Sequence, residues 1–386
     1  MHILEISSFF PPHGGLFALE QARALKAQGN EVRMLACVQL GLSVDQSFYY
    51  KARRDRWWEV MEGVEVYRCY MRAMPRVIRA NQQRWCRIVL EMYEEYKQRY
   101  GRPDVLHAHC CQWAGVAARM VAEKEGIPYF ITEHLPSGIF EANYGKGWRK
   151  AEWAKGLLKE TYEHARQVIP VSAELVDDLA PFFGKGYSFT PISNIIDVDF
   201  FAYRPRKARG HGPFRFCCLA IGDVYRKGYD VLAKAMKNMN RAKEREEFVD
   251  IELHIAGKGT ESEKMRRLFA GMENVIIHGE LNKEGVRDLL YESDALVLAS
   301  RSEAQGLVIM EAVCTGIPVV TTDAIPQNAL TEGACLIAKA GDALSLRQRM
   351  QEVVRLDFDL QWSENLRKKV APDVIARKII EVFNQA

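Results

Sequence analysis

Short apolar runs alternate with amphipathic stretches along the whole chain. Several of the runs are apolar at nearly every position, which is typical of strands buried on both faces of a parallel sheet. In the first half of the chain, strands are predicted at 2–7, 31–37, 104–109 and 128–132, and helices at 16–28 and 115–125. Strands and helices that alternate in this way predict an α/β fold, with an open parallel sheet and helices on both faces.

A second series of alternating elements starts after a break in the pattern. Residues 203–213 are basic, rich in glycine and proline, and show no apolar period, which favours a linker. Beyond this segment, strands are predicted at 214–221, 250–256, 274–278, 295–299 and 317–321. A chain of 386 residues is long enough for two domains with a full core each, so two sheets of similar architecture are expected.

Two glutamates, Glu303 and Glu311, stand with seven residues between them where a predicted strand gives way to a helix at 307–313. In such βαβ units, ligands bind beyond the carboxyl ends of the strands, where the helix N-terminus favours phosphate. Carboxylates there accept hydrogen bonds from hydroxyls. A ligand with sugar or ribose hydroxyls beside a diphosphate therefore suits both the carboxylates and the helix N-terminus. The alternative is that 302–305 is only a helix capping box, in which Glu303 complements the helix dipole.

The whole segment 300–320 resembles the E-x7-E signature of the family-4 retaining glycosyltransferases, including the flanking Glu-Ala and Gly-x-Pro-Val-Val. The resemblance implies that Glu303 holds hydroxyls of the donor sugar and that Glu311 takes the ribose hydroxyls. It also implies that the backbone N–H groups of Gly306 and Leu307 bind the diphosphate. The aromatic residue that usually follows the first glutamate is replaced here by Ala304-Gln305, which leaves the donor sugar open.

This resemblance covers nearly the whole chain and implies the GT-B architecture, in which two Rossmann-like domains face each other across a cleft. The expected acceptor-side domain comprises residues 1–203, and the expected nucleotide-sugar-binding domain comprises 204–369. In that family the last helix crosses back to the first domain, which assigns residues 370–386 to it, with a helix at 373–383.

Candidate side chains of the first domain follow its predicted strands. Two glycines, of which Gly15 matches the family's glycine loop, open the helix at 16–28 and let the backbone approach donor phosphates or acceptor closely. By resemblance, His134 contacts the transferred sugar and the backside of the reacting carbon, so it is a catalytic candidate together with the donor-sugar glutamate. His109 and Glu133 are expected to bind or orient the acceptor. The alternative is that these histidines are structural residues at strand ends.

The turn at 222–228 follows the first predicted strand of the second domain. The family usually carries Arg directly after the first glycine and Lys before the last, and both reach the diphosphate. Lys227 matches, but Asp223 stands at the arginine position, so either Arg226 replaces that cation or its charge is lost. At least one cation is needed for the leaving nucleoside diphosphate unless a metal supplies the charge. An ordinary surface Lys-Gly turn is the alternative.

Other sequence features exclude several classes of function. The D-x-D sequences at 197–199 and 357–359 match the metal motif of the other glycosyltransferase fold, but both lie outside the candidate sites, so neither a metal nor a cofactor is expected. Nine cysteines without a C-x-x-C indicate reduced, buried thiols, and a net charge of +3 gives no argument for nucleic acid. No apolar run reaches the roughly 18 residues of a membrane span and the first residues carry no basic leader, so a cytoplasmic protein is expected.

Six arginines between positions 68 and 87 have no acidic residue among them and are interleaved with apolar residues. Such a basic amphipathic segment can bind the anionic inner face of a membrane. A solvated face, or arginines that line an acceptor groove, fits the sequence equally well. The six are Arg68, Arg72, Arg76, Arg79, Arg84 and Arg87.

Together these features predict retaining transfer of a sugar from a nucleoside-diphosphate sugar to a glycan, a lipid-linked sugar or a small polar molecule, in the assembly of cell-surface glycan or glycolipid. Retention, and a front-face displacement without a protein nucleophile, follow from the resemblance alone. Two alternatives remain: an epimerase or phosphorylase of the same architecture, and a donor-binding subunit without activity, which the intact candidate residues disfavour. Neither the nucleotide, UDP or GDP, nor the sugar nor the acceptor follows from the sequence.

Overall fold

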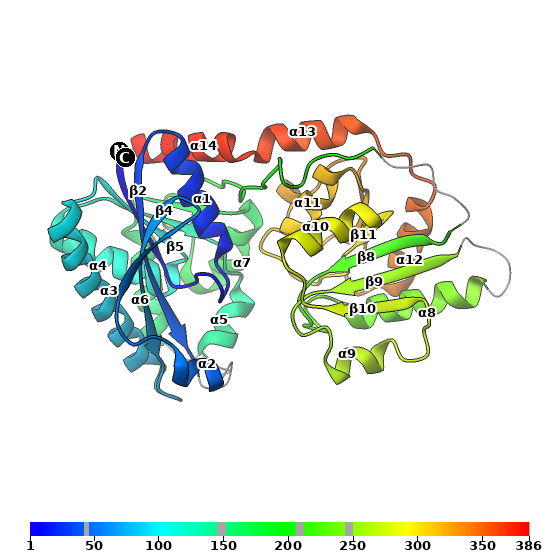
Figure 1. The fold of residues 1–386 in the computed structure, drawn as a ribbon, viewed down its shortest axis with the longest axis horizontal. Helices are drawn as coiled ribbons and strands as arrows, with labels where there is room; N and C mark the ends of the chain where they lie inside the picture. Colours follow the sequence, from blue (N-terminus) through cyan, green and yellow to red (C-terminus); the bar gives the residue numbers. More distant parts are fainter. Residues whose placement is uncertain (42–45, 145–151, 206–211, 244–249, 386) are drawn as a thin grey trace. The chain divides into compact units, whose positions relative to one another are not determined.

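The structure is a computed structural model that describes residues 1–41, 46–144, 152–205, 212–243 and 250–385. The chain forms two compact units, Met1–Ile195 with Pro372–Ala386 and Ile196–Ala371 (Figure 1). Each unit is an α/β assembly with its own parallel sheet, which confirms the predicted GT-B class of two Rossmann-like domains. Part of the predicted linker, 206–211, lies outside the described residues, and the domain limits at 203 and 369 stay a prediction.

The first unit contains a seven-stranded sheet in the order β3-β4-β2-β1-β5-β6-β7. All neighbouring strands are parallel except β3 and β4, which pair antiparallel. The strands are β1 (His2–Ser7), β2 (Glu31–Leu40), β3 (Trp57–Met61), β4 (Val64–Arg72), β5 (Val105–His109), β6 (Tyr129–Glu133) and β7 (Gln167–Pro170). Every residue of β5 and β6 is buried, as expected for parallel strands with both faces covered.

Helices cover this first sheet, and the last of them comes from the far end of the chain. They are α1 (Leu16–Ala27), α2 (Gln46–Lys51), α3 (Ile78–Tyr100), α4 (Val116–Glu125), α5 (Ser137–Tyr144), α6 (Glu152–Glu163), α7 (Ala173–Phe183) and α14 (Pro372–Asn384). Helix α14 packs against α1, and its buried residues Ile375, Ile379 and Phe383 join the same apolar core as Leu19 and Phe130 (Figure 1).

The second unit contains a six-stranded parallel sheet in the order β10-β9-β8-β11-β12-β13. Its strands are β8 (Phe214–Leu219), β9 (Ile251–Ala256), β10 (Val275–Gly279), β11 (Ala295–Val297), β12 (Val319–Thr322) and β13 (Cys335–Ala338). Its helices are α8 (Tyr229–Lys243), α9 (Glu263–Leu268), α10 (Lys283–Glu292), α11 (Leu307–Thr315), α12 (Ala343–Val353) and α13 (Leu360–Val370). The helix predicted at 307–313 is therefore confirmed, and it ends at Gly316 in a left-handed conformation.

Each sheet has one point at which the order of its strands reverses. In the first unit β1 lies between β2 and β5, and in the second unit β8 lies between β9 and β11. Ligands of open α/β sheets bind beyond the carboxyl ends of the strands at such a switch point. The glycine loop with Gly15 follows β1, His109 ends β5, and the segments 222–228 and 300–306 follow β8 and β11, so they lie at these two places.

The arginines of the basic segment at 68–87 do not lie on one structural element. Arg68 and Arg72 belong to β4, and helix α3 begins only at Ile78. Arg68 is buried and ion-paired to Glu59, so it cannot reach a lipid surface. Because the arginines are evenly spaced from 68 to 87, the sequence gives no sign that a strand ends and a helix begins within this segment. No helix in the described ranges combines the length and the apolar character that a bilayer span requires.

Candidate active site

Glycines bring two loops of the second unit close together. A Cβ atom on Gly228 would lie 1.8 Å from the carbonyl oxygen of Ala299, and one on Gly222 would lie 2.3 Å from that of Gly259. Gly228 also has a positive φ of 67°. Only glycine fits where backbones approach this closely. The loop after β8 is therefore fixed directly against the segment that follows β11.

This approach brings Lys227 to Glu303. The Lys227 ammonium forms an ion pair with the Glu303 carboxylate, and the Ser300 hydroxyl donates to the same carboxylate oxygen at 2.7 Å. Only 12% and 10% of the two charged side chains are exposed. The N–H of Arg301 donates to the carbonyl oxygen of Arg226 at 2.8 Å and joins the two loops. The predicted diphosphate cation and the predicted sugar-binding carboxylate thus share one place.

Asp223, at the position where the family carries arginine, accepts two hydrogen bonds from Arg226. They run from its backbone N–H at 3.0 Å and from its Nε at 3.2 Å. Burial favours a higher pKa for Asp223, but the bonds from Arg226 and the charges of Arg226 and Lys227 lower this pKa overall. Asp223 therefore stays ionised and retains the Arg226 guanidinium in the loop, beside Lys227.

Helix α11 begins at Leu307, shortly after Glu303 in the chain. Gly306 caps it in a left-handed conformation with a φ of 92°. The first N–H groups of an α-helix have no partner within the helix, and they carry the positive end of its dipole. Glu311 lies one turn after Leu307 on this helix and is partly buried. A helix N-terminus and two carboxylates are thus combined at one switch point.

In the first unit, the glycine loop and the end of β5 form the corresponding place. Gly15 caps α1 with a φ of 77°, and a Cβ atom on it would lie 2.0 Å from the carbonyl oxygen of Phe9. Any other residue would therefore displace the loop.

The strand before the glycine loop, β1, carries a buried carboxylate, Glu5. Glu5 accepts hydrogen bonds from His107 Nδ1 at 3.1 Å and from His109 Nε2 at 2.8 Å, and all three side chains are fully buried. Burial favours a higher pKa for Glu5, but His107 and His109 lower it to about 2. Burial also lowers the pKa of His109. A proton on Nε2 leaves a lone pair on Nδ1 of His109, which has no hydrogen-bond partner among the described residues.

Glu5, His107 and His109 are also the one group in the described ranges whose donor atoms lie close enough together to hold a metal ion. The hydrogen bonds from both imidazoles to the carboxylate account for this arrangement. We therefore treat it as a hydrogen-bonded cluster.

His134 lies above this cluster, 8% exposed. Its ring packs against Phe17 at 3.9 Å between centroids in a tilted arrangement, and the His109 ring lies 5.8 Å away. Burial, followed by the charges of His109 and His107, lowers the pKa of His134 well below its usual range, so the ring is neutral. Neither ring nitrogen has a hydrogen-bond partner within the described part of the chain. A buried imidazole with two open positions points to a polar ligand.

Glu133, in contrast, is saturated by protein donors. Its carboxylate accepts from the N–H groups of Cys111 at 2.8 Å and of His134 and Leu135 at 2.9 Å, and from the Tyr162 hydroxyl at 2.6 Å. This geometry favours orientation of the neighbouring histidine over direct contact with an acceptor.

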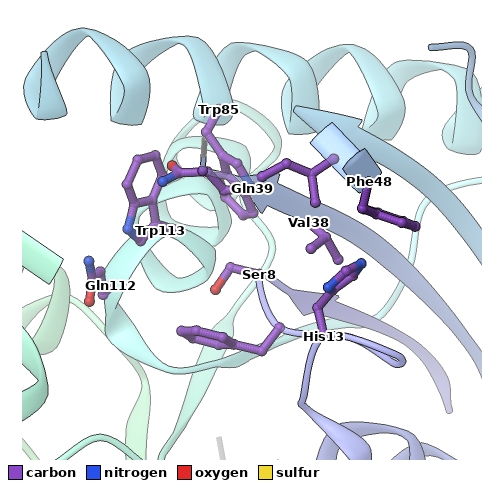
Figure 2. A pocket seen from close by; sticks show the side chains of 11 residues that line it. Ser8, His13, Val38, Gln39, Phe48, Trp85, Gln112 and Trp113 are labelled. Carbon is purple, nitrogen blue, oxygen red and sulfur yellow. The ribbon is translucent and has the colours of Figure 1, made fainter. Parts of the chain in front are cut away.

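A cavity of about 310 Å³ opens at the carboxyl ends of β1, β2 and β5 (Figure 2). Its lining residues were not predicted, because they come from five separate segments whose proximity only the sheet order reveals. They are Ser8, Phe9, His13, Val38, Gln39, Leu40, Gly41, Phe48, Trp85, Gln112 and Trp113.

Sequence comparison agrees with this division. Residues 14–194 match the glycosyl transferase 4-like domain, and residues 215–355 match the glycosyl transferases group 1 domain. The chain is a family-4 glycosyltransferase. The two matches fall one in each compact unit.

Two relatives show the range of this family. TuaC of Bacillus subtilis, named as a teichuronic acid biosynthesis glycosyltransferase, is 28% identical over 84% of this chain and 81% of its own length. A D-inositol 3-phosphate glycosyltransferase of Pseudarthrobacter chlorophenolicus is 30% identical over 61% of this chain and 58% of its own length.

Solved structures share the fold. The sucrose-phosphate synthase of Thermosynechococcus elongatus superposes with a TM-score of 0.76 at 17% identity, over 100% of this chain and 99% of that one. HepE of Anabaena, solved with UDP and glucose, gives a TM-score of 0.69 at 13% identity and covers 100% of both chains. At these identities the similarity establishes the fold alone.

Proposed function

We propose that this glycosyltransferase binds a nucleoside-diphosphate sugar in its second unit and transfers the sugar, with retention, to a polar acceptor. The observation that carries the proposal is the pair of Lys227 and Glu303 beside the N-terminus of α11. A cation and free backbone N–H groups suit a diphosphate, and a carboxylate beside them suits sugar hydroxyls.

Each group then has a distinct part. Lys227, together with the N–H groups of Gly306 and Leu307, binds the diphosphate. Glu303 accepts hydrogen bonds from the donor sugar, and Glu311 accepts them from the ribose. Because Lys227 is paired with Glu303 before the donor binds, donor entry exchanges this ion pair for contacts with phosphate and hydroxyl groups. Arg226, fixed by Asp223, adds a second positive charge.

In the transfer step, the bond between the anomeric carbon and the phosphate oxygen breaks while the acceptor oxygen bonds the same face of that carbon. The acceptor proton passes to the leaving phosphate, so no protein nucleophile takes part. Lys227 and the α11 N-terminus stabilise the negative charge that develops on the diphosphate. The neutral His134 donates a hydrogen bond to the transferred sugar, and Glu133 orients it.

The comparisons support the choice of donor and pathway. HepE was solved with UDP and glucose, which supports a UDP-sugar, with a GDP-sugar as the alternative. TuaC is named for teichuronic acid biosynthesis, which supports a role in cell-surface glycan assembly. Because protein cations and a helix end supply the charge, we expect transfer in excess EDTA at the rate seen without chelator.

We further propose peripheral contact with an anionic membrane at the turn between β4 and α3. Met74 and Val77 are 49% and 41% exposed there, Arg76 and Arg79 are exposed beside them, and Arg87 is exposed further along α3. Exposed apolar residues among cations suit the interface of an anionic bilayer.

Hydrolysis of UDP-, GDP- and ADP-sugars without acceptor tests the proposed activity. We expect one nucleotide class to raise the melting temperature, because it binds only the folded chain, and the matching sugar nucleotide to release free sugar slowly. An epimerase would instead return an isomeric sugar nucleotide. Failure of every sugar nucleotide to bind would overturn the proposal.

A further inference from the structure

The cavity of the first unit carries information about the acceptor. Its lining includes four phenylalanine or tryptophan rings, the imidazole of His13, two amides and one hydroxyl (Figure 2). None of the eleven described lining residues is Asp, Glu, Lys or Arg. Its volume of about 310 Å³ is at the lower end of the range for small-molecule sites, roughly 300–1,000 Å³, which suits one sugar ring.

The aromatic wall of this cavity is held in place before any ligand arrives. Trp85 donates from Nε1 to the carbonyl oxygen of Cys37 at 2.8 Å, and its ring meets Trp113 edge to face at 5.9 Å. Trp113 itself has a φ of 66°, which is rare for a residue other than glycine. The segment after β5 is anchored by the bond from Cys111 N–H to Glu133. A prearranged aromatic wall loses little entropy on binding.

Ser8 supplies an open hydrogen-bonding position between the two sides of the cavity. It follows β1, and Figure 2 shows it between Trp113 and His13. Its Oγ is buried and has no hydrogen-bond partner among the described residues. Buried hydroxyls normally have partners, so this one points to a ligand group.

A phosphate does not fit these surroundings. Burial of an unpaired anion costs far more than burial of a hydroxyl, so a phosphate site needs fixed cations or several converging N–H donors. The described lining has no Arg or Lys, and its one imidazole, His13, packs against the Phe48 ring at 4.6 Å between centroids. Arg68 lies close to the loop before the cavity, but its guanidinium is bound to Glu59 and to the carbonyl oxygen of Pro11. It is therefore engaged in holding the loop.

From these observations we infer that the cavity receives an uncharged sugar ring as the acceptor group. Aromatic faces are negative and attract the C–H groups of a pyranose, while Ser8, Gln39 and the other polar side chains match its hydroxyls. The inference rests on the proposed transferase function. It sets this chain apart from its relative named for D-inositol 3-phosphate, because that compound carries a phosphate.

Saturation-transfer NMR with the full chain tests the inference. The probes are the methyl glycosides of glucose, galactose, mannose and N-acetylglucosamine, compared with glucose 6-phosphate and inositol 1-phosphate. We expect signal from at least one neutral glycoside and none from the phosphorylated probes. Signal from a phosphorylated probe alone, or no signal from any neutral glycoside, overturns it.

Variants locate the binding. Ser8→Ala should weaken the neutral glycoside about tenfold without lowering the melting temperature, because the lost hydroxyl has no protein partner. Trp113→Phe should also weaken it, whereas Trp58→Phe, which alters a tryptophan stacked on Tyr67 outside the cavity, should not. Gln39→Lys should gain binding of glucose 6-phosphate. Unchanged glycoside affinity in both Ser8→Ala and Trp113→Phe overturns the assignment.

Donor hydrolysis separates this inference from the proposed function. A chain that hydrolyses a sugar nucleotide but binds only phosphorylated probes keeps the proposed function and loses the inference. A chain that binds no sugar nucleotide loses the proposed function, whatever the glycosides show.

Discussion

The two switch points are built from opposite kinds of chemistry. In the second unit, charges meet in pairs: Lys227 with Glu303, and Arg226 with Asp223. In the first unit, the buried carboxylate of Glu5 accepts hydrogen bonds from His107 and His109, and burial lowers the pKa of His109 and of His134. On the proposed function, the difference follows from what each half has to bind. A diphosphate requires fixed positive charge, whereas a sugar at the reacting carbon requires hydrogen bonds from groups that do not change their own charge.

The largest effect is expected from the charged half. Lys227→Met should lower kcat/KM about 100- to 1,000-fold, because it removes a cation that stabilises the leaving diphosphate. Steady-state kinetics with the cognate sugar nucleotide would measure it. Lys185→Met, which breaks the exposed pair with Asp177, is the matched control and should have no effect. Normal kinetics in Lys227→Met would show that the pair is only structural.

In the first unit, Glu5 should contribute mainly to the free energy of unfolding. Its pKa of about 2 lies below the ordinary 4.5, so it stabilises the fold above pH 4.5, and this stabilisation is lost as the pH falls toward 2. Glu5→Gln should therefore cost about 3 kcal/mol at neutral pH. Melting temperatures of wild type and variant should converge below about pH 4.5. A constant gap across this range contradicts the prediction, and the exposed Glu62→Gln serves as control.

His134 should affect turnover and leave nucleotide binding intact. His134→Ala is expected to lower kcat about 100-fold, in the range for one positioned polar group, with nearly unchanged affinity for the nucleoside diphosphate. Calorimetry and kinetics on the same preparation would show this division. His164→Ala, which alters an exposed histidine directly after α6, is the control. Wild-type turnover in His134→Ala would make the histidine structural.

Glu311, in contrast to His134, should affect nucleotide binding more than turnover. Glu311→Ala is expected to weaken the cognate nucleoside diphosphate by about 2 kcal/mol, the usual cost of losing a charged hydrogen-bond partner. Calorimetry with the diphosphate alone isolates this loss from catalysis. The exposed Glu332→Ala should bind as wild type does. Equal affinity in Glu311→Ala would remove the ribose role.

The smallest effects are expected from exposed arginines for which the described residues show no ion pair with a carboxylate. Arg76, Arg79 and Arg87 should each contribute about 1 kcal/mol to binding of anionic vesicles, and salt should screen it. Flotation of the wild type and of the triple Ser variant at low and high salt measures this. Arg53→Ser, whose native guanidinium is paired with Asp55, is the control. No flotation of the wild type at low salt would leave these arginines as a solvated face.

The sequence predicts a site best where the residues that form it are close together in the chain. The segment 300–320 contains its strand end, glycine, helix and both glutamates, so local pattern predicts their places. Glu5 was missed because one glutamate inside an apolar strand gives no sign of its partners, and only the pairing of β1 with β5 brings it to His107 and His109. The cavity was missed for the same reason: Trp85 and Ser8 lie on different elements, and the positive φ of Trp113 has no signature in its residue type.

The place of α14 has a consequence for how the chain folds during synthesis. Phe383 packs on Phe130 at 4.6 Å and on His107 at 5.2 Å, beneath the histidine cluster of the first unit. The first unit therefore cannot close its core until residue 383 has left the ribosome, although most of it is made first. The second unit, Ile196–Ala371, is continuous and can fold earlier. The order of folding is then the reverse of the order of synthesis, and the part of the site in the first unit is completed last.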